Sequence, residues 1–86
     1  MSEVADRVRR IIAERAFLDP ATIRADATAE DLGIDSVTMV ETIFAIEVAF
    51  DLSIPFNANT PEGAGFDVTS VGAIIASVEA LVAARV

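Results

Sequence analysis

Apolar residues recur at helical spacing in three segments of this chain, and this periodicity restricts the fold more than any other feature. Residues three and four positions apart share one face of an α-helix, so each segment presents an apolar stripe to a common core. We predict helices over about residues 2–16 and 36–50, and a last helix capped by Thr69 or Ser70. The stripes are Val4, Val8, Ile11 and Ile12; Met39, Ile43, Ile46 and Phe50; and Val71, Ile74, Ile75, Val78, Leu81 and Val82.

The segments between these helices are of unequal length. The sequence Phe17-Leu18-Asp19-Pro20 ends the first helix, and a long loop follows as far as Asp35. Apolar residues inside this loop are expected to anchor it to the core. These anchors are Ile23, Leu32 and Ile34.

A short third helix is predicted at Thr60-Pro61-Glu62, which supplies an N-cap residue followed by proline at the first helical position. Gly63 and Gly65 weaken it soon afterwards. The fold class is therefore predicted as all-α, a small four-helix bundle with a long loop between helices one and two and a short third helix.

Composition restricts function as well as fold. A chain of 86 residues, 53% of them apolar, forms one domain, residues 1–86, with one modest core. It contains neither cysteine nor histidine, which removes disulfides, Cys/His metal sites and the commonest general base. We therefore expect neither an enzyme nor a metal-binding protein.

The N-terminus alternates acidic and apolar residues and has no secretory signal pattern. The apolar stretches are far shorter than the roughly 20 residues that a membrane span needs. We expect a cytoplasmic monomer without stable membrane insertion.

Charge is distributed unevenly along the chain. Five of the six arginines lie in the first 24 residues, whereas residues 25–84 hold ten carboxylates and no basic residue. The resulting negative field argues against nucleic acid and anionic membranes, and for partners with basic surfaces. The alternative is an acidic surface that serves only solubility.

Gly33-Ile34-Asp35-Ser36-Val37 places one hydroxyl where a loop becomes a helix. Gly33 permits a left-handed turn, and Asp35 is the expected N-cap. Ser36 would then be the first or second helical residue, exposed at the positive end of the helix dipole, where a phosphoester is favoured. The alternative is that Asp35 and Ser36 merely cap the helix.

The helix over residues 36–50 carries a second apolar stripe beside the first, so its apolar arc is too wide for one core. Either the helix is unusually buried, or this stripe faces solvent and awaits a partner. Glu47 lies between Val40 and Phe44 on the helical wheel, and an unpaired carboxylate is costly to bury. We therefore predict a partner-binding face. It comprises Val37, Val40, Phe44 and Val48, flanked by Glu41 and Glu47.

These motifs resemble those of the acyl carrier proteins, in which Asp-Ser-Leu follows Leu-Gly and an aliphatic residue; here Val37 replaces the leucine. The resemblance extends to Phe50–Pro55 and Val68–Gly72, and only the segment between Phe56 and Asp67 is longer than in ordinary bacterial carriers.

The resemblance implies that Ser36 carries 4′-phosphopantetheine, transferred from coenzyme A by a separate magnesium-dependent phosphopantetheinyl transferase that recognises Asp35. The arm would hold acyl chains as thioesters for fatty-acid or specialised lipid biosynthesis, exchanged with acyl-loading, acyltransferase or synthase enzymes. Family members commonly carry acids at positions held here by Thr38, Val48 and Ala49. This less charged helix and the longer segment resemble carriers of lipid A very-long-chain or nodulation-type pathways.

Other interpretations remain open at this point. The chain could be an aminoacyl, peptidyl or polyketide carrier of a stand-alone cluster, or an unmodified acidic helical interaction module. Residues 56–67 are either a gate for the acyl chain, pinned at its ends by Phe56 and Phe66, or a tolerated insertion. Small residues of the last helix either leave room for an acyl chain or allow close packing. They are Gly72, Ala73, Ala76 and Ala80.

Overall fold

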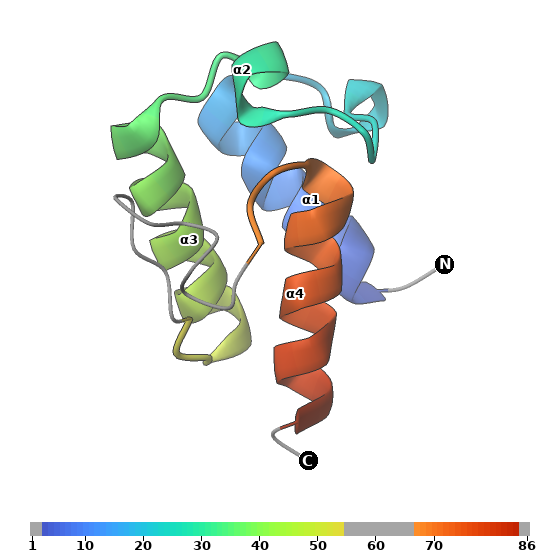
Figure 1. The fold of residues 1–86 in the computed structure, drawn as a ribbon, viewed down its shortest axis with the longest axis vertical. Coiled ribbons are helices and arrows are strands. Elements are labelled where there is room, and N and C mark those ends of the chain that lie inside the picture. Colours follow the sequence, from blue (N-terminus) through green and yellow to red (C-terminus); the bar gives the residue numbers. More distant parts are fainter. Residues whose placement is uncertain (1–2, 55–66, 85–86) are drawn as a thin grey trace.

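The computed structural model describes residues 3–54 and 67–84, and every regular element within them is helical. Three longer helices, α1 Glu3–Ala16, α3 Ser36–Phe50 and α4 Val71–Ala84, form the bundle. Helix α1 packs against both α3 and α4, and it runs antiparallel to them (Figure 1). The predicted all-α bundle is confirmed.

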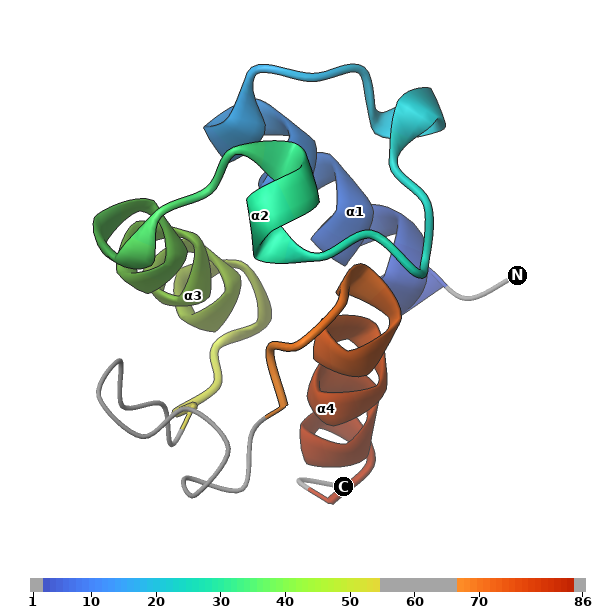
Figure 2. The ribbon, with the colours of Figure 1, turned by 45° about the horizontal axis from the view of Figure 1, so that its top comes forward.

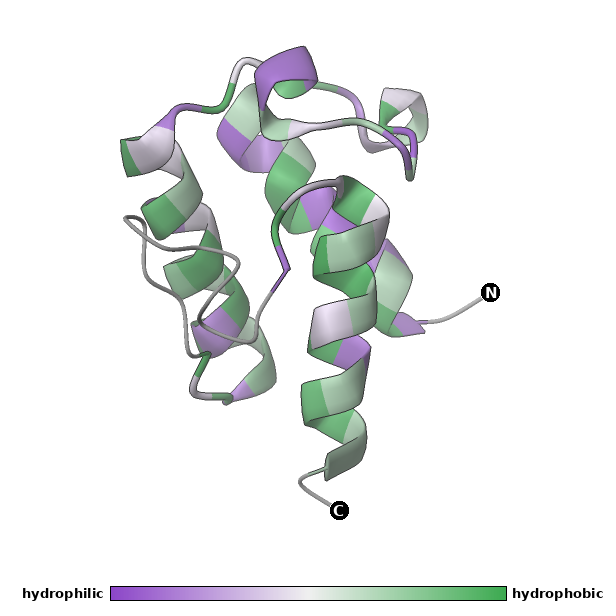
Figure 3. Ribbon diagram, in the orientation of Figure 1, coloured by the Kyte–Doolittle hydropathy of each residue, from purple (hydrophilic) through white to green (hydrophobic). Residues whose placement is uncertain are grey.

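The core lies where the three longer helices meet, and it uses the predicted apolar stripes. Hydrophobic residues recur along almost the whole of α3 and α4 (Figure 3). Val4, Ile11, Phe50, Leu81 and Val82 pack at the margin of the core as partly buried residues. The buried side chains include Val8, Ile12, Met39, Ile43, Ile46, Val71, Ile74, Ile75 and Val78, joined by the loop anchors Ile23 and Ile34.

The connection between α1 and α3 is more ordered than the predicted long loop. It contains a 3₁₀ helix, η1 Pro20–Thr22, and a short helix, α2 Ala29–Leu32, which lies over the end of the bundle where α3 and α4 begin (Figure 2). A capping box starts α2: Asp31 N donates to Thr28 Oγ1 over 3.1 Å, and Thr28 N donates to an Asp31 carboxylate oxygen over 3.0 Å. The loop prediction was therefore incomplete.

The start of α4 settles which of two predicted residues caps it. Ala73 N donates to Ser70 Oγ over 3.1 Å, so Ser70 is the N-cap. The predicted short helix at residues 60–62 lies outside the described residues. The short helix that the structure does describe is α2, which precedes α3.

Phe17 ends α1 in a conformation that phenylalanine rarely adopts. Its φ of 58° is left-handed, and Leu18 N donates to Ala13 O over 2.9 Å, which makes a Schellman motif with Phe17 at the position usually held by glycine. The side chain is 93% exposed, so its packing does not offset the backbone strain.

We expect Phe17→Gly to stabilise the protein. Glycine adopts a left-handed φ without a Cβ clash, and removing this strain is worth about 1 kcal/mol. The free energy of unfolding in urea should rise by about this amount. Phe17→Ala is the control, because it removes the exposed ring but keeps the Cβ; equal stabilisation by alanine would show that backbone strain is not the cause.

Candidate functional site

The site is built where α2 ends and α3 begins. Gly33 closes α2 with the predicted left-handed backbone, φ 71°, and Ile34 N donates to Ala29 O over 2.9 Å. The Ile34 side chain is buried in the core, so it fixes the turn from inside. Asp35 and Ser36 follow at once and are both exposed.

Asp35 is the N-cap of α3, as predicted. Its carboxylate accepts a 2.8 Å hydrogen bond from Thr38 N, and its carbonyl oxygen accepts one of 2.8 Å from Met39 N. Hydrogen bonding by the Thr38 backbone N–H, and then by the Thr38 side chain, lowers the pKa of the Asp35 carboxyl below its usual value. Asp35 is therefore ionised at neutral pH and holds the first turn of the helix.

Ser36 is the first residue of α3, and its exposed hydroxyl has no hydrogen-bond partner among the described residues. The hydroxyl lies at the N-terminus of a 15-residue helix, where unpaired N–H groups and the helix dipole favour a phosphoester. A phosphopantetheine group attached to Ser36 would thus meet no steric obstacle from the described residues. The sequence has no histidine that could act as general base for this hydroxyl.

Helix α3 has one buried face and one exposed face. The predicted second stripe is exposed, while Met39, Thr42, Ile43 and Ile46 are buried on the other side. The alternative of an unusually buried helix is therefore wrong. We call the exposed stripe the α3 face; that partners bind it stays a prediction. Its residues are Val37 (68% exposed), Val40 (46%), Phe44 (64%) and Val48 (68%).

The two acids that flank the α3 face differ in their exposure and in their hydrogen bonds. Glu41 is exposed and has no ion pair or side-chain hydrogen bond with a described residue. Glu47 is half-buried, and its Oε2 atom accepts a 2.7 Å hydrogen bond from Ile54 N. Glu47 thus holds the segment that follows α3 against that helix. Sequence spacing gave no signal for this contact, because Ile54 returns to Glu47 only after the turn at Asp51.

We expect Glu47→Ala to destabilise the fold by about 1–3 kcal/mol, since it leaves the Ile54 N–H without its charged acceptor. Glu41→Ala on the same helix removes an equal charge without removing such a bond, so it should change the stability by less than about 0.5 kcal/mol. Urea unfolding of the two variants measures this difference. Equal effects would mean that the Glu47 bond contributes nothing to the fold.

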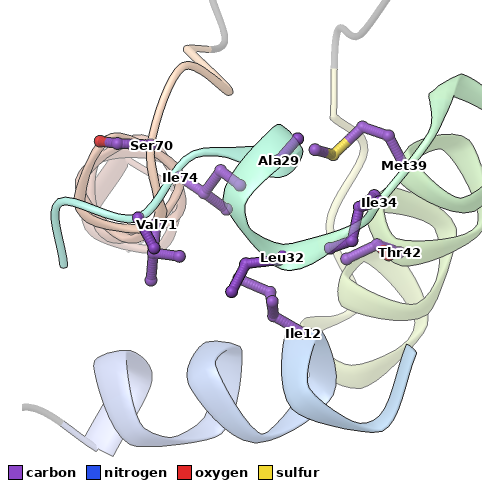
Figure 4. Close-up of a pocket in the computed structure, with 10 residues that line it drawn as sticks. Ile12, Ala29, Leu32, Ile34, Met39, Thr42, Ser70, Val71 and Ile74 are labelled. Atoms are coloured by element: carbon purple, nitrogen blue, oxygen red, sulfur yellow. The ribbon is translucent and has the colours of Figure 1, made fainter. Parts of the chain in front are cut away.

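An apolar cavity of about 10 Å³ lies between the helices (Figure 4). Its lining comes from α1, α2, α3 and the start of α4, and includes Ile12, Leu32, Met39 and Ile74. A cavity of this size holds at most about one water molecule. An acyl chain could enter only if the helices moved apart.

The small residues of α4 do not widen this cavity. Gly72 N donates to Ala25 O over 2.7 Å, and a Cβ added at Gly72 would lie 3.1 Å from that oxygen. Gly72 therefore allows close packing, which was the alternative prediction. Ala76 and Ala80 are exposed, and neither they nor Ala73 line this cavity; that they leave room for an acyl chain stays a prediction.

The predicted gate at residues 56–67 lies, except for Asp67, outside the described residues. Asp67 N donates to Ser77 Oγ over 3.1 Å, and Thr69 donates to the Asp67 carboxylate through both its N–H and its hydroxyl. The bond from the Thr69 hydroxyl, and then that from the Thr69 N–H, lower the pKa of the Asp67 carboxyl below its usual value. The chain is thus held to α4 where it re-enters the bundle.

Residues 3–54 and 67–84 lack two further features that could indicate a function. None of the helices there is long and apolar enough to cross a membrane. No group of acidic side chains there is arranged to hold a metal ion.

Comparison with known proteins adds independent information on this site. A family model described as a phosphopantetheine attachment site matches residues 6–59, which include Ser36. The acyl carrier protein AcpXL of Brucella melitensis biotype 1 is 43% identical over 63 residues, which cover 72% of this chain and 68% of the relative. The acyl carrier protein AcpXL of Brucella suis biovar 1 matches with the same identity and coverage.

Proposed function

This chain belongs to the acyl carrier protein family, and from that premise we propose that Ser36 is the residue to which its 4′-phosphopantetheine arm is attached. The protein is a carrier and not an enzyme, so attachment and acyl transfer are performed by its partners. The observation that carries the proposal is the exposed Ser36 hydroxyl at the start of α3, which makes no hydrogen bond with a described residue.

The proposed attachment step is a phosphoryl transfer. The Ser36 oxygen bonds to the pantetheine phosphorus of coenzyme A, the phosphoanhydride bond breaks, and the nucleotide portion leaves. The hydroxyl proton passes to a base of the transferase. Asp35 holds the first turn of α3 and keeps the Ser36 hydroxyl facing solvent, so we propose that the transferase recognises this pair.

The attached arm supplies a terminal thiol that holds an acyl chain as a thioester. We propose that these chains serve specialised lipid biosynthesis. The composition of the α3 face supports this proposal, because its four exposed apolar residues suit partners that make apolar contacts. The match to acyl carriers favours an acyl over an aminoacyl or peptidyl cargo, and the attachment-site match disfavours the unmodified interaction module.

Mapping the modified residue tests the proposal. The full chain is incubated with coenzyme A, magnesium and a promiscuous transferase, digested, and sequenced by tandem mass spectrometry. We expect one arm per chain, on the peptide that contains Ser36. An arm on any other serine or threonine would refute the assignment while leaving family membership intact.

A further inference from the structure

A second hollow lies between α1 and η1, away from the site at Ser36. It has a volume of about 300 Å³ and is lined by Asp6, Arg9, Arg10, Pro20, Ala21 and Ile23. Two views place η1 on the opposite side of the bundle from α3 (Figures 1 and 2). The hollow is wide open to solvent, so it could take a small group.

The two arginines of this hollow form no ion pair or side-chain hydrogen bond with any residue of segments 3–54 and 67–84. Arg9 Nε is buried and has no hydrogen-bond partner, and neither Arg9 nor Arg10 makes an ion pair with a described residue. Arg24 shows the contrast, because its Nε lies 3.0 Å from an Asp26 carboxylate oxygen. The Nε donor of Arg9 therefore lacks the acceptor that buried donors usually have, whereas the Arg9 side chain as a whole is half-buried and that of Arg10 is exposed. An oxygen acceptor that binds from outside could pair with both guanidinium groups.

The charge of the residues that line the hollow indicates the chemical class of that acceptor. Two guanidinium groups and the Asp6 carboxylate give the hollow a formal charge of +1, in a protein whose net charge is −8. A singly charged anion would neutralise it. The donors of a guanidinium group are arranged to bond two oxygen atoms of one anion at once, which selects phosphate and carboxylate groups over chloride.

We propose that the hollow between α1 and η1 binds a small oxyanion, a phosphate or carboxylate group, through Arg9 and Arg10. Pro20, Ala21 and Ile23 form the remaining wall, so an apolar portion of the same ligand can lie beside the charged group. This site is separate from the attachment of the arm, and its test uses the unmodified chain.

Nitrogen-15 NMR of the full chain tests the proposal directly. Sodium phosphate and sodium acetate are titrated at constant ionic strength, with sodium chloride as the balancing salt. We expect a saturable shift of the Arg9 Nε–Hε signal and of the amide signals of Ala21 and Ile23. Saturation by phosphate alone would assign a phosphate site, and saturation by both anions a general oxyanion site.

Matched variants locate the binding. Arg9→Lys keeps the charge but loses the paired donors, and Arg10→Gln removes the second cation; each should weaken phosphate binding by at least about tenfold. Arg15→Gln removes an arginine of α1 that does not line the hollow, so it should bind as the wild type does. Circular dichroism checks that each variant is folded. Shifts that chloride reproduces, or that survive both Arg9→Lys and Arg10→Gln, would overturn the proposal.

Discussion

Ser36→Ala is expected to abolish attachment of the phosphopantetheine arm, so that intact-protein mass spectrometry shows no gain of mass after incubation with coenzyme A, magnesium and a transferase. The wild-type chain should gain one arm. Alanine removes the only atom at this position that can bond to phosphorus. The fold should persist, because the Ser36 hydroxyl makes no hydrogen bond with a described residue.

Ser70 offers a matched control for this experiment. It also lies at the start of a helix, but it is the N-cap residue, is half-buried, and its Oγ atom accepts a hydrogen bond from Ala73 N. Ser70→Ala should therefore accept the arm as the wild type does. Its free energy of unfolding should fall by about 1 kcal/mol, because the N-cap of α4 is removed. A modified Ser36→Ala protein would place the attachment elsewhere.

The local geometry around Ser36 was predictable from sequence because its causes are local. Gly33 ends one helical turn, and Asp35 caps the next helix through a bond to Thr38, three residues away. Such rules depend on the order of residues and not on the tertiary fold. The division of α3 into buried and exposed stripes followed from helical spacing in the same way.

The features that sequence reasoning missed have two different causes. Helix α2 is only four residues long, too short for periodicity to show; the Thr28-x-x-Asp31 capping box was the available signal. The bond from Ile54 to Glu47 and the close approach of Gly72 to Ala25 depend on how distant segments meet. The secondary-structure propensities of single residues do not indicate which distant segments come into contact.

The contact at Glu47 changes how docking on the α3 face should be tested. Replacing both flanking acids would combine a loss of charge with a loss of the bond to Ile54. A substitution of Glu41 alone tests the effect of charge on docking. Glu41→Lys should slow modification by a transferase with a basic surface, and the effect should shrink as salt rises, because exposed charges are screened over about 8 Å at physiological ionic strength.

Phe44→Ala should have the larger effect on docking. Phe44 is the largest apolar side chain of the α3 face and is 64% exposed, so a partner that covers it removes its ring from water. Burying such a side chain is worth about 1.5–3 kcal/mol, and losing it should lower kcat/KM for arm transfer by at least about tenfold. Steady-state kinetics with the purified transferase measures this change.

Phe17→Ala is the matched control, because Phe17 is the more exposed phenylalanine, at 93%, but lies at the end of α1 and outside the α3 face. If the transferase binds the α3 face, only the Phe44 variant should show a lower kcat/KM for arm transfer. This defect should change little with salt because the lost contact is apolar. Equal rates for both variants and the wild type would mean that the transferase does not bind the α3 face at Phe44. A slow Phe17 variant would instead extend the docking surface to the end of α1.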